Sequence, residues 1–338
     1  MKFKKVLLGL AVVACTASAQ AATTLETIKE KGYLQCGVSQ GLPGFSNPDD
    51  KGNWTGLDVD YCRALAAAIF GDAEKVRFTP LSAKERFTAL SSGEIDVLSR
   101  NTTWSMTRDT QLGLNFVGVT YYDGQGMMVP KSLGATSAKE LDGAKICVNT
   151  GTTTELNITD YFKTHNMGFE LVAFEKSDEV IAAYGAGRCD VYTTDRSGVA
   201  AERLKLANPD DHMVLPEIIS KEPLGPVVRQ GDDQWFNIGR WVYYALLNAE
   251  EFGITSANVD EMANSENPEI KRFLGKDDSK FGEGIGLGND WAYNIVKLVG
   301  NYGEIYDRNV GPDTPLKLER GVNALWTEGG IQYAPPVR

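Results

Sequence analysis

Two segments of this 338-residue chain repeat one order of elements: an apolar helical stripe, a glycine stop, a short buried strand and then polar residues. The first copy covers residues 86–103 and the second covers residues 180–195. In open α/β sheets, ligands bind outside the carboxyl ends of the strands. Two such ends in one chain therefore predict two lobes that face one ligand.

Each copy leads to a charged side chain. Arg108 follows the first copy and Asp195 ends the second. A guanidinium grips a carboxylate with two parallel hydrogen bonds, whereas a carboxylate accepts hydrogen bonds from an ammonium group. The plainer alternatives are a solvated arginine and an aspartate that caps a helix starting near Gly198. A cation and an anion on opposite walls suit a zwitterion.

Hydroxyl and amide side chains accompany these charges. Asn101 and Thr103 alternate along an extended segment, so their side chains share one side and either contact a ligand or form a turn. Thr152, Thr153 and the two residues after them match a capping box. A helix start with free N–H groups attracts an anion, although the same motif also serves only to cap its helix.

The order of the expected elements is that of two βαβαβ units. In the first unit we expect strands at 33–38, 76–79 and 95–98 and helices at 58–70 and 83–92. In the second we expect strands at 145–149, 170–174 and 189–193.

Segments 124–130 and 221–228 are expected to cross between the lobes. Lobe 1 is then formed by residues 22–128 and 222–338, and lobe 2 by residues 129–221. Further helices are expected at 233–252 and 291–306, whereas 253–290 and the residues after 311 are rich in loops.

The first 21 residues have the pattern of an export signal peptide. Three lysines precede an apolar run at 6–14 that is too short to span a bilayer, and Ala19-Gln20-Ala21 forms a cleavage site. The alternative is a lipoprotein box at residues 12–15, which would attach a lipid to Cys15. No later run of about 18 apolar residues exists, so the mature chain is expected to be soluble in the periplasm.

Composition and charge narrow the class of partner. The chain is 42% hydrophobic and 23% charged, as in globular proteins, and its net charge is −11. Removal of the signal would take the charge to about −14. An acidic surface disfavours nucleic acid and anionic membrane as partners.

Four cysteines remain after cleavage: Cys36, Cys62, Cys147 and Cys189. An even number in an exported protein indicates disulfides, for which three pairings are possible, and buried thiols are the alternative. We favour Cys36–Cys62 and Cys147–Cys189, because each pairing stays within its own lobe. The chain has no C-x-x-C spacing and two histidines, so neither a metal site, a cofactor nor a catalytic triad is expected.

The segment Gly56-Leu57-Asp58-Val59-Asp60 and the helix after it resemble the signature of periplasmic solute-binding proteins for amino acids, family 3, with Tyr61 as a departure. Segments 36–45, 221–226 and 299–304 resemble more closely the general L-amino-acid-binding proteins of ABC transporters. The resemblance implies an α/β, two-lobed periplasmic-binding-protein fold of type II, with two βαβ-type lobes joined by two crossing strands.

The resemblance also implies roles for matching positions. Arg108 stands where the family binds the ligand carboxylate, and Asp195 stands where it binds the ammonium group. Thr103, Asn101 and Thr153 match positions that hold the amino-acid head group, with Thr152 as a neighbour.

The side-chain wall departs from histidine- and lysine-type relatives. Those relatives place an aromatic residue where this chain has Leu42, and another apolar side chain near Ala83. Trp54, Phe87 and Trp104 either substitute for that residue or belong to the core. Smaller walls would hold the ligand side chain less tightly and widen the choice of ligand.

The implied function is capture of L-amino acids by hinge closure and delivery to the membrane permease of an ABC transporter, by a monomer without enzymatic activity. One alternative is a periplasmic enzyme on the same scaffold, such as a dehydratase, which would need a general acid or base in the cleft. Another is a sensor module, which would need a membrane segment or a signalling domain.

Overall fold

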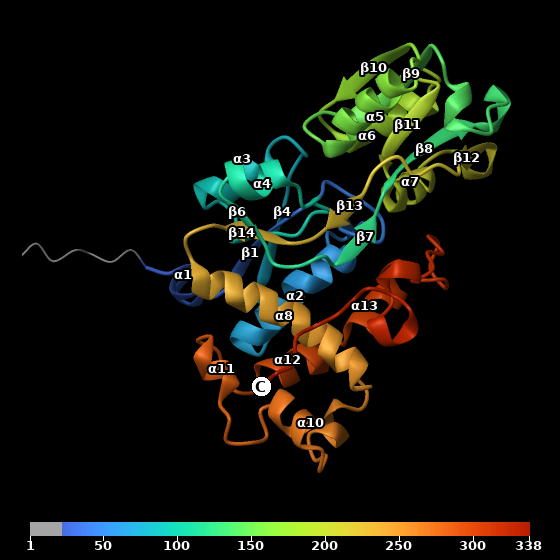
Figure 1. Ribbon diagram of the computed structural model, residues 1–338. Coiled ribbons are helices and arrows are strands. Elements are labelled where there is room, and N and C mark those ends of the chain that lie inside the picture. Colours follow the sequence, from blue (N-terminus) through green and yellow to red (C-terminus); the bar gives the residue numbers. More distant parts are fainter. Residues whose placement is uncertain (1–21) are drawn as a thin grey trace, which may run out of the picture.

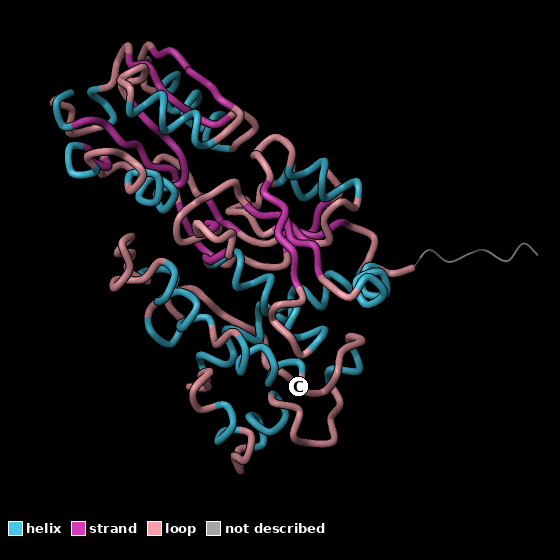
Figure 2. The backbone as a smooth tube through the Cα atoms, turned by 180° about the vertical axis from the view of Figure 1, so that it is seen from behind, coloured by secondary structure: helices cyan, strands magenta, loops and turns pink. Residues whose placement is uncertain are grey.

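The computed structural model describes residues 22–338, so the predicted signal peptide and Cys15 lie outside the described residues. The described chain forms two lobes, each built on a five-stranded sheet (Figure 1). From behind, the strands fall into two separate groups with helices around each (Figure 2).

The first lobe contains the sheet β4-β1-β5-β14-β6. β4, β1 and β5 run parallel, as expected from their βαβαβ order, and β14 and β6 complete the sheet with antiparallel pairing. The strands are β1 (Leu34–Val38), β4 (Val76–Pro80), β5 (Val97–Leu98), β6 (Leu114–Phe116) and β14 (Val227–Arg229). The accompanying elements are α1 (Thr24–Lys31), α2 (Leu57–Phe70), α3 (Arg86–Ser92), α4 (Met106–Gln111) and the hairpin of β2 (Asn47–Pro48) and β3 (Trp54–Thr55).

The second lobe contains the sheet β10-β9-β11-β8-β12. β10, β9 and β11 are parallel, and β8 and β12 are antiparallel additions at one side. The strands are β8 (Gln125–Pro130), β9 (Ala144–Asn149), β10 (Phe169–Phe174), β11 (Val191–Asp195) and β12 (His212–Val214). The helices are α5 (Thr153–Thr164), α6 (Ser177–Gly185) and α7 (Arg196–Arg203).

The lobes are joined by β7 (Tyr121–Asp123) and β13 (Glu222–Leu224), which pair antiparallel with Glu222 opposite Asp123. The sequence placed one crossing segment at 124–130, but β8 pairs along its length with the second sheet. The predicted lobe boundary after residue 128 therefore falls inside a strand. A strand that is apolar along its whole length has no alternation of apolar and polar residues. Its sequence therefore does not indicate which sheet it joins, which explains the difference.

Helices from the C-terminal part cover the first lobe. α8 (Asp233–Glu251), α12 (Trp291–Leu298) and α13 (Tyr302–Asn309) pack against α2, and they lie below the first sheet in Figure 1. The helix predicted at 291–306 is wrong, because Gly300 has a φ of 96° and Asn301 opens a new helix with Glu304 in a capping box. The remaining short helices are α9 (Val259–Met262), α10 (Pro268–Phe273) and α11 (Phe281–Gly284).

Both disulfides that the sequence favours are present, Cys36–Cys62 and Cys147–Cys189. The first links β1 to α2, and the second links β9 to the turn before β11. Each lies within one lobe and leaves the crossing strands unconstrained. Among residues 22–338, no helix combines the length and the apolar character that crossing a membrane requires.

Candidate ligand site between the lobes

The first wall of the site is the loop that follows β5, and α2 holds it in place. Gly56 has a φ of 132°, and a Cβ there would lie 2.1 Å from the carbonyl oxygen of Phe45. This close turn starts α2 with Asp58 buried, and Asp58 Oδ2 accepts a hydrogen bond of 2.8 Å from the backbone N of Asn101. The bond fixes Asn101 at a φ of 32°, a conformation that asparagine tolerates better than most residues. The signature motif therefore positions a predicted site residue.

Four of the six predicted side chains meet across the two lobes. Asn101 Nδ2 donates to Asp195 Oδ2 at 3.0 Å. The hydroxyl oxygens of Thr103 and Thr153 lie 3.3 Å apart. The carboxyl end of β5 in one lobe thus faces the carboxyl end of β11 and the start of α5 in the other.

Glu222 lies at the centre of this contact, and the sequence interpretation gave it no role. It is 1% exposed and stands on the crossing strand β13. Its Oε2 accepts hydrogen bonds from the hydroxyls of Thr103 (2.5 Å) and Thr153 (2.8 Å). Its Oε1 accepts from Ser220 Oγ (2.6 Å) and Asn157 Nδ2 (2.7 Å). One carboxylate therefore fixes predicted ligand residues from both lobes.

Arg108 is buried beside the same group. It lies on α4, its guanidinium is 5.0 Å from the centre of the Phe87 ring, and its Nη1 donates to the carbonyl oxygen of Thr103 at 2.8 Å. Among the described residues it makes no other hydrogen bond through the guanidinium. Burial lowers the pKa of Arg108 to about 10, against the opposing effect of Glu222 and Asp195. The guanidinium stays charged at neutral pH and retains donors for a further group.

Asp195 does not act as a helix cap, although it occupies the N-cap position of α7. Its side chain makes no capping hydrogen bond. Burial, followed by the charges of Asp123 and Glu222, raises the pKa of Asp195 to about 8. Asn101 and Arg86 act in the opposite direction. A buried carboxylate with one side-chain donor has room for a cationic group, which would favour its ionised form.

Thr152 and Thr153 share the start of α5 but differ in what their hydroxyls do. Thr152 caps the helix, because its hydroxyl accepts from the backbone N of Glu155 (3.1 Å) and donates to the carbonyl oxygen of Asn149 (2.7 Å). Thr153 is turned instead toward Glu222. The capping interpretation therefore holds for the hydroxyl of Thr152. We name Asn101, Thr103, Arg108, Thr153, Asp195 and Glu222 the head-group cluster.

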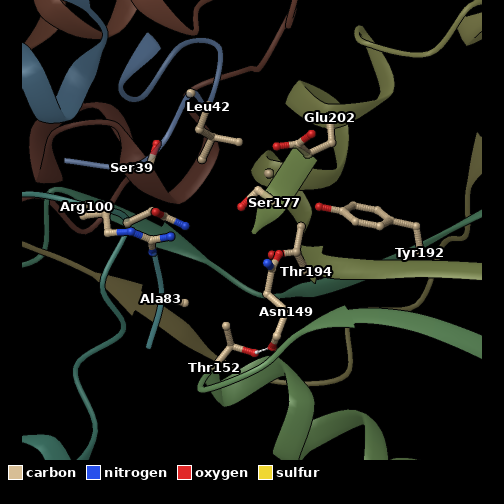
Figure 3. Close-up of a pocket in the computed structure, with 13 residues that line it drawn as sticks. Ser39, Leu42, Ala83, Arg100, Asn149, Thr152, Ser177, Tyr192, Thr194 and Glu202 are labelled. Atoms are coloured by element: carbon tan, nitrogen blue, oxygen red, sulfur yellow. Dashed lines mark hydrogen bonds between the residues drawn. The ribbon is translucent and has the colours of Figure 1, made fainter. Parts of the chain in front are cut away.

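A small cavity of about 40 Å³, partly open to solvent, borders this cluster between the lobes. Figure 3 shows side chains from the two lobes facing each other across it. The first lobe contributes Ser39, Gly41, Leu42, Ala83, Arg100 and Asn101. The second lobe contributes Asn149, Thr152, Ser177, Tyr192, Thr194, Gly198 and Glu202. Of the six predicted site residues, Asn101 and Thr152 line this cavity.

The aromatic residues considered as substitutes are elsewhere. Trp54 lies against Phe78, Trp104 stacks on Phe116, and Phe87 packs under Arg108. None of the three is among the residues that line the cavity. Leu42 and Ala83 form this part of the wall without an aromatic ring. In residues 22–338, no group of three or more histidine, cysteine, aspartate or glutamate side chains is arranged to hold a metal ion.

Comparison with known sequences identifies the family. The sequence model of the bacterial extracellular solute-binding proteins, family 3, matches residues 34–238. This chain belongs to that family. The matched region contains both walls of the site and both crossing strands, so the predicted family and the two-lobed α/β fold are confirmed.

Individual relatives match over nearly the whole length. The general L-amino acid-binding periplasmic protein AapJ of Rhizobium johnstonii is 67% identical over 332 residues, which cover 98% of this chain and 97% of the relative. The glutamate/glutamine/aspartate/asparagine-binding protein BztA of Rhodobacter capsulatus is 54% identical over 98% of both chains. These relatives are named as binding proteins rather than enzymes.

A solved structure agrees with the fold. The ABC transporter periplasmic binding protein from Brucella ovis, with glutathione bound, has a TM-score of 0.92 and 61% sequence identity. The match covers 94% of this chain and 100% of that one.

Proposed function

We propose that this chain is a periplasmic binding protein that captures L-amino acids between its lobes and delivers them to the permease of an ABC transporter. One observation carries the proposal. The guanidinium of Arg108 and the carboxyl group of Asp195 are buried in one cluster between the lobes, and each makes a single side-chain hydrogen bond to the described protein. Their remaining hydrogen-bond donors and acceptors suit the two ionised ends of an α-amino acid.

Each end of the ligand has a partner of matching chemistry. Arg108 takes the α-carboxylate, and the start of α5 at Thr153 adds the favourable end of a helix dipole. Asp195 takes the α-ammonium, with the amide of Asn101 and the hydroxyl of Thr103 beside it. Exclusion of water on closure strengthens each of these charged contacts.

The two lobes close as bodies about β7 and β13. The pairing of these strands is short, and the disulfides leave it free, so rotation needs no change inside either sheet. A ligand that contacts both lobes stabilises the closed state, which a permease then distinguishes from the open one. The chain acts as a monomer after cleavage behind Ala21.

A second candidate ligand is a γ-glutamyl peptide. The structure from Brucella ovis holds glutathione, whose γ-glutamyl end has the same α-ammonium and α-carboxylate groups as a free amino acid. A head-group cluster that recognises those two ions would accept this end as well. The cavity beyond the cluster then decides between the two classes.

A thermal-shift screen of the mature chain, residues 22–338, tests the proposal. We expect several L-amino acids to raise the melting temperature, because a ligand at about 100 times its dissociation constant adds about 2.7 kcal/mol of stability. Des-amino analogues should give much smaller shifts, and glutathione is included to test the second candidate. Absence of any shift with all twenty amino acids at millimolar concentration would overturn the proposal.

A further inference from the structure

Beyond the head-group cluster, the cavity wall contains a buried carboxylate with one uncommitted oxygen. Glu202 on α7 is 1% exposed. Its Oε1 accepts a hydrogen bond of 3.1 Å from Lys205 Nζ, whereas its Oε2 is buried and has no partner among the described residues. In Figure 3 this carboxylate is turned toward the wall that carries Leu42. A buried acceptor without a donor is costly, so its position in a binding cavity needs an explanation.

Three hydroxyl groups share this end of the cavity. Ser177, Tyr192 and Thr194 line it, and among residues 22–338 their hydroxyls make no hydrogen bond to another residue. Figure 3 shows these side chains on the same wall as Glu202, opposite Arg100. A hydroxyl both donates and accepts, so the group offers partners for either kind of polar atom. The cavity therefore has unused hydrogen-bonding capacity away from the head-group cluster.

The spacing along α7 relates this region to the ammonium site. Asp195 is at the N-cap of α7, and Glu202 is seven residues later, about two turns or roughly 10 Å along the axis. Residues at this spacing lie on one face of a helix. A ligand whose ammonium group contacts Asp195 can extend along that face. Its side chain then ends near Glu202.

We propose that Glu202 recognises the far end of the ligand side chain, with Oε2 accepting a hydrogen bond from an amide or ammonium group. This inference rests on the proposed function, because it requires the head group to bind at Asp195. The hydroxyls of Ser177, Tyr192 and Thr194 donate to a carbonyl oxygen at the same end. An amide side chain donates to Glu202 Oε2 and accepts from the hydroxyls, so it is matched by both. A carboxylate side chain of the same length is repelled by the like charge of Glu202.

Lys205 connects this recognition to closure of the lobes. Its Nζ is shared between Glu202 Oε1 in the second lobe and the carbonyl oxygen of Gly41, 2.6 Å away in the first lobe. Burial raises the pKa of Glu202 to about 7, and the charge of Lys205 opposes this rise. A ligand donor at Oε2 favours the ionised carboxylate, which in turn strengthens its bond to Lys205.

Calorimetry with L-glutamine, L-glutamate and L-alanine tests the inference at pH 7.5. Glu202→Gln should shift the ratio of glutamate to glutamine affinity at least tenfold toward glutamate, and the alanine affinity should stay within threefold. Lys205→Met should weaken all three ligands by a similar factor. Asp178→Asn is the matched control, because Asp178 is a second carboxylate partner of Lys205, exposed and outside the cavity. It should leave the ratio unchanged.

An unchanged ratio in a folded Glu202→Gln protein would overturn the inference while leaving the proposed function intact. If the wild-type protein binds none of the three ligands, the proposed function itself fails. If Glu202→Gln does not fold, a modified ligand tests the inference on the wild-type protein. The γ-methyl ester of L-glutamate has no side-chain donor and should bind the wild-type protein at least tenfold more weakly than L-glutamine, and equal affinities would overturn the inference.

Discussion

The head-group cluster and the cavity beside it differ in how far their polar groups are already paired. In the cluster, Glu222 holds Thr103 and Thr153 in place, and Asn101 is held by Asp58. In the cavity, Glu202 Oε2 and the hydroxyls of Tyr192, Ser177 and Thr194 have no such partners among the described residues.

The difference matches the two parts of an amino acid. In the proposed function, the α-ammonium and α-carboxylate are common to all ligands, so a fixed arrangement would recognise them without reorganisation and keep the ordering cost of binding low. The side chain varies, and uncommitted donors and acceptors adapt to several kinds. The proposal therefore assigns breadth of specificity to the cavity and affinity to the cluster.

The largest effect is expected for the cationic end of the cluster. Arg108→Ala should weaken all L-amino acids by about a thousandfold, because truncating one partner of a buried charge pair costs about 2–5 kcal/mol. Calorimetry measures the affinity, and the melting temperature reports on the fold. Arg77→Ala is the control, since Arg77 is an exposed arginine of the same lobe stacked on Tyr33. Unchanged affinity in Arg108→Ala would remove this residue from the site.

A smaller loss, about a hundredfold, is expected for Asp195→Asn with α-amino acids, corresponding to about 2.7 kcal/mol. Asparagine keeps the shape and loses the charge that an ammonium group requires. Des-amino analogues should lose much less. Asp210→Asn, at an exposed site of the same lobe, should change neither. Equal losses for both classes of ligand would refute the ammonium assignment.

The pH dependence of binding should follow Asp195. Its pKa is raised to about 8 in the ligand-free protein, and the ammonium group binds the ionised form. Affinity should therefore fall as the pH decreases below 8, by at most about tenfold per pH unit. Calorimetry in buffers of different ionisation heat should detect release of protons on binding, and Asp195→Asn should reduce it.

The raised pKa of Asp195 also predicts how the stability of the ligand-free protein changes with pH. Because the folded-state pKa of Asp195 lies above its usual 3.8, its contribution to the stability of the ligand-free protein is full below pH 3.8. That contribution is lost as the pH rises through about 8. Asp195→Asn should flatten this part of the pH profile of the melting temperature. A wild-type slope that Asp195→Asn leaves unaltered would contradict the assignment.

The Glu222→Gln variant tests whether Glu222 positions the other residues of the head-group cluster or contacts the ligand itself. The amide presents one acceptor oxygen to four donors, so we expect a loss of about 1–3 kcal/mol in the free energy of unfolding and roughly tenfold weaker binding of every amino acid. Glu217→Gln is the control, since that carboxylate accepts from Ser137 away from the cluster. Loss of affinity for one ligand alone would place Glu222 in side-chain recognition instead.

The smallest effect is expected at the apolar wall of the cavity. Leu42→Phe should lower the affinity for long side chains by about threefold and leave L-alanine unchanged, because the larger ring takes up cavity space. Leu133→Phe, at an exposed position of the other lobe, is the control. Equal changes for alanine and the long ligands would show that the cluster and the cavity are not independent.

Local sequence signals predicted the two sheets and the proximity of several residues of the head-group cluster. The repeated helix–strand phrase placed Asn101, Thr103 and Asp195 at strand ends, where the structure brings the two lobes together. Glu222 and Glu202 were missed for a physical reason. The hydroxyl partner of Glu222 in the first lobe is 119 residues away, and no local pattern marks a carboxylate whose partners come from other segments.

The predicted element boundaries were wrong where one sequence pattern is compatible with two structures. The stripe at 291–306 continues across Gly300 although the chain turns there. The apolar strand β8 fits either sheet, and its pairing with β11 and β12 is decided by tertiary packing.

The most direct test of the account is a crystal structure of the mature protein with L-glutamine bound. We expect the α-carboxylate on the guanidinium of Arg108, the α-ammonium within hydrogen-bonding distance of Asp195 Oδ1 or Oδ2, and the side chain in the cavity beside α7. A head group bound elsewhere, or an Asp195 carboxylate that contacts only protein in the complex, would contradict it.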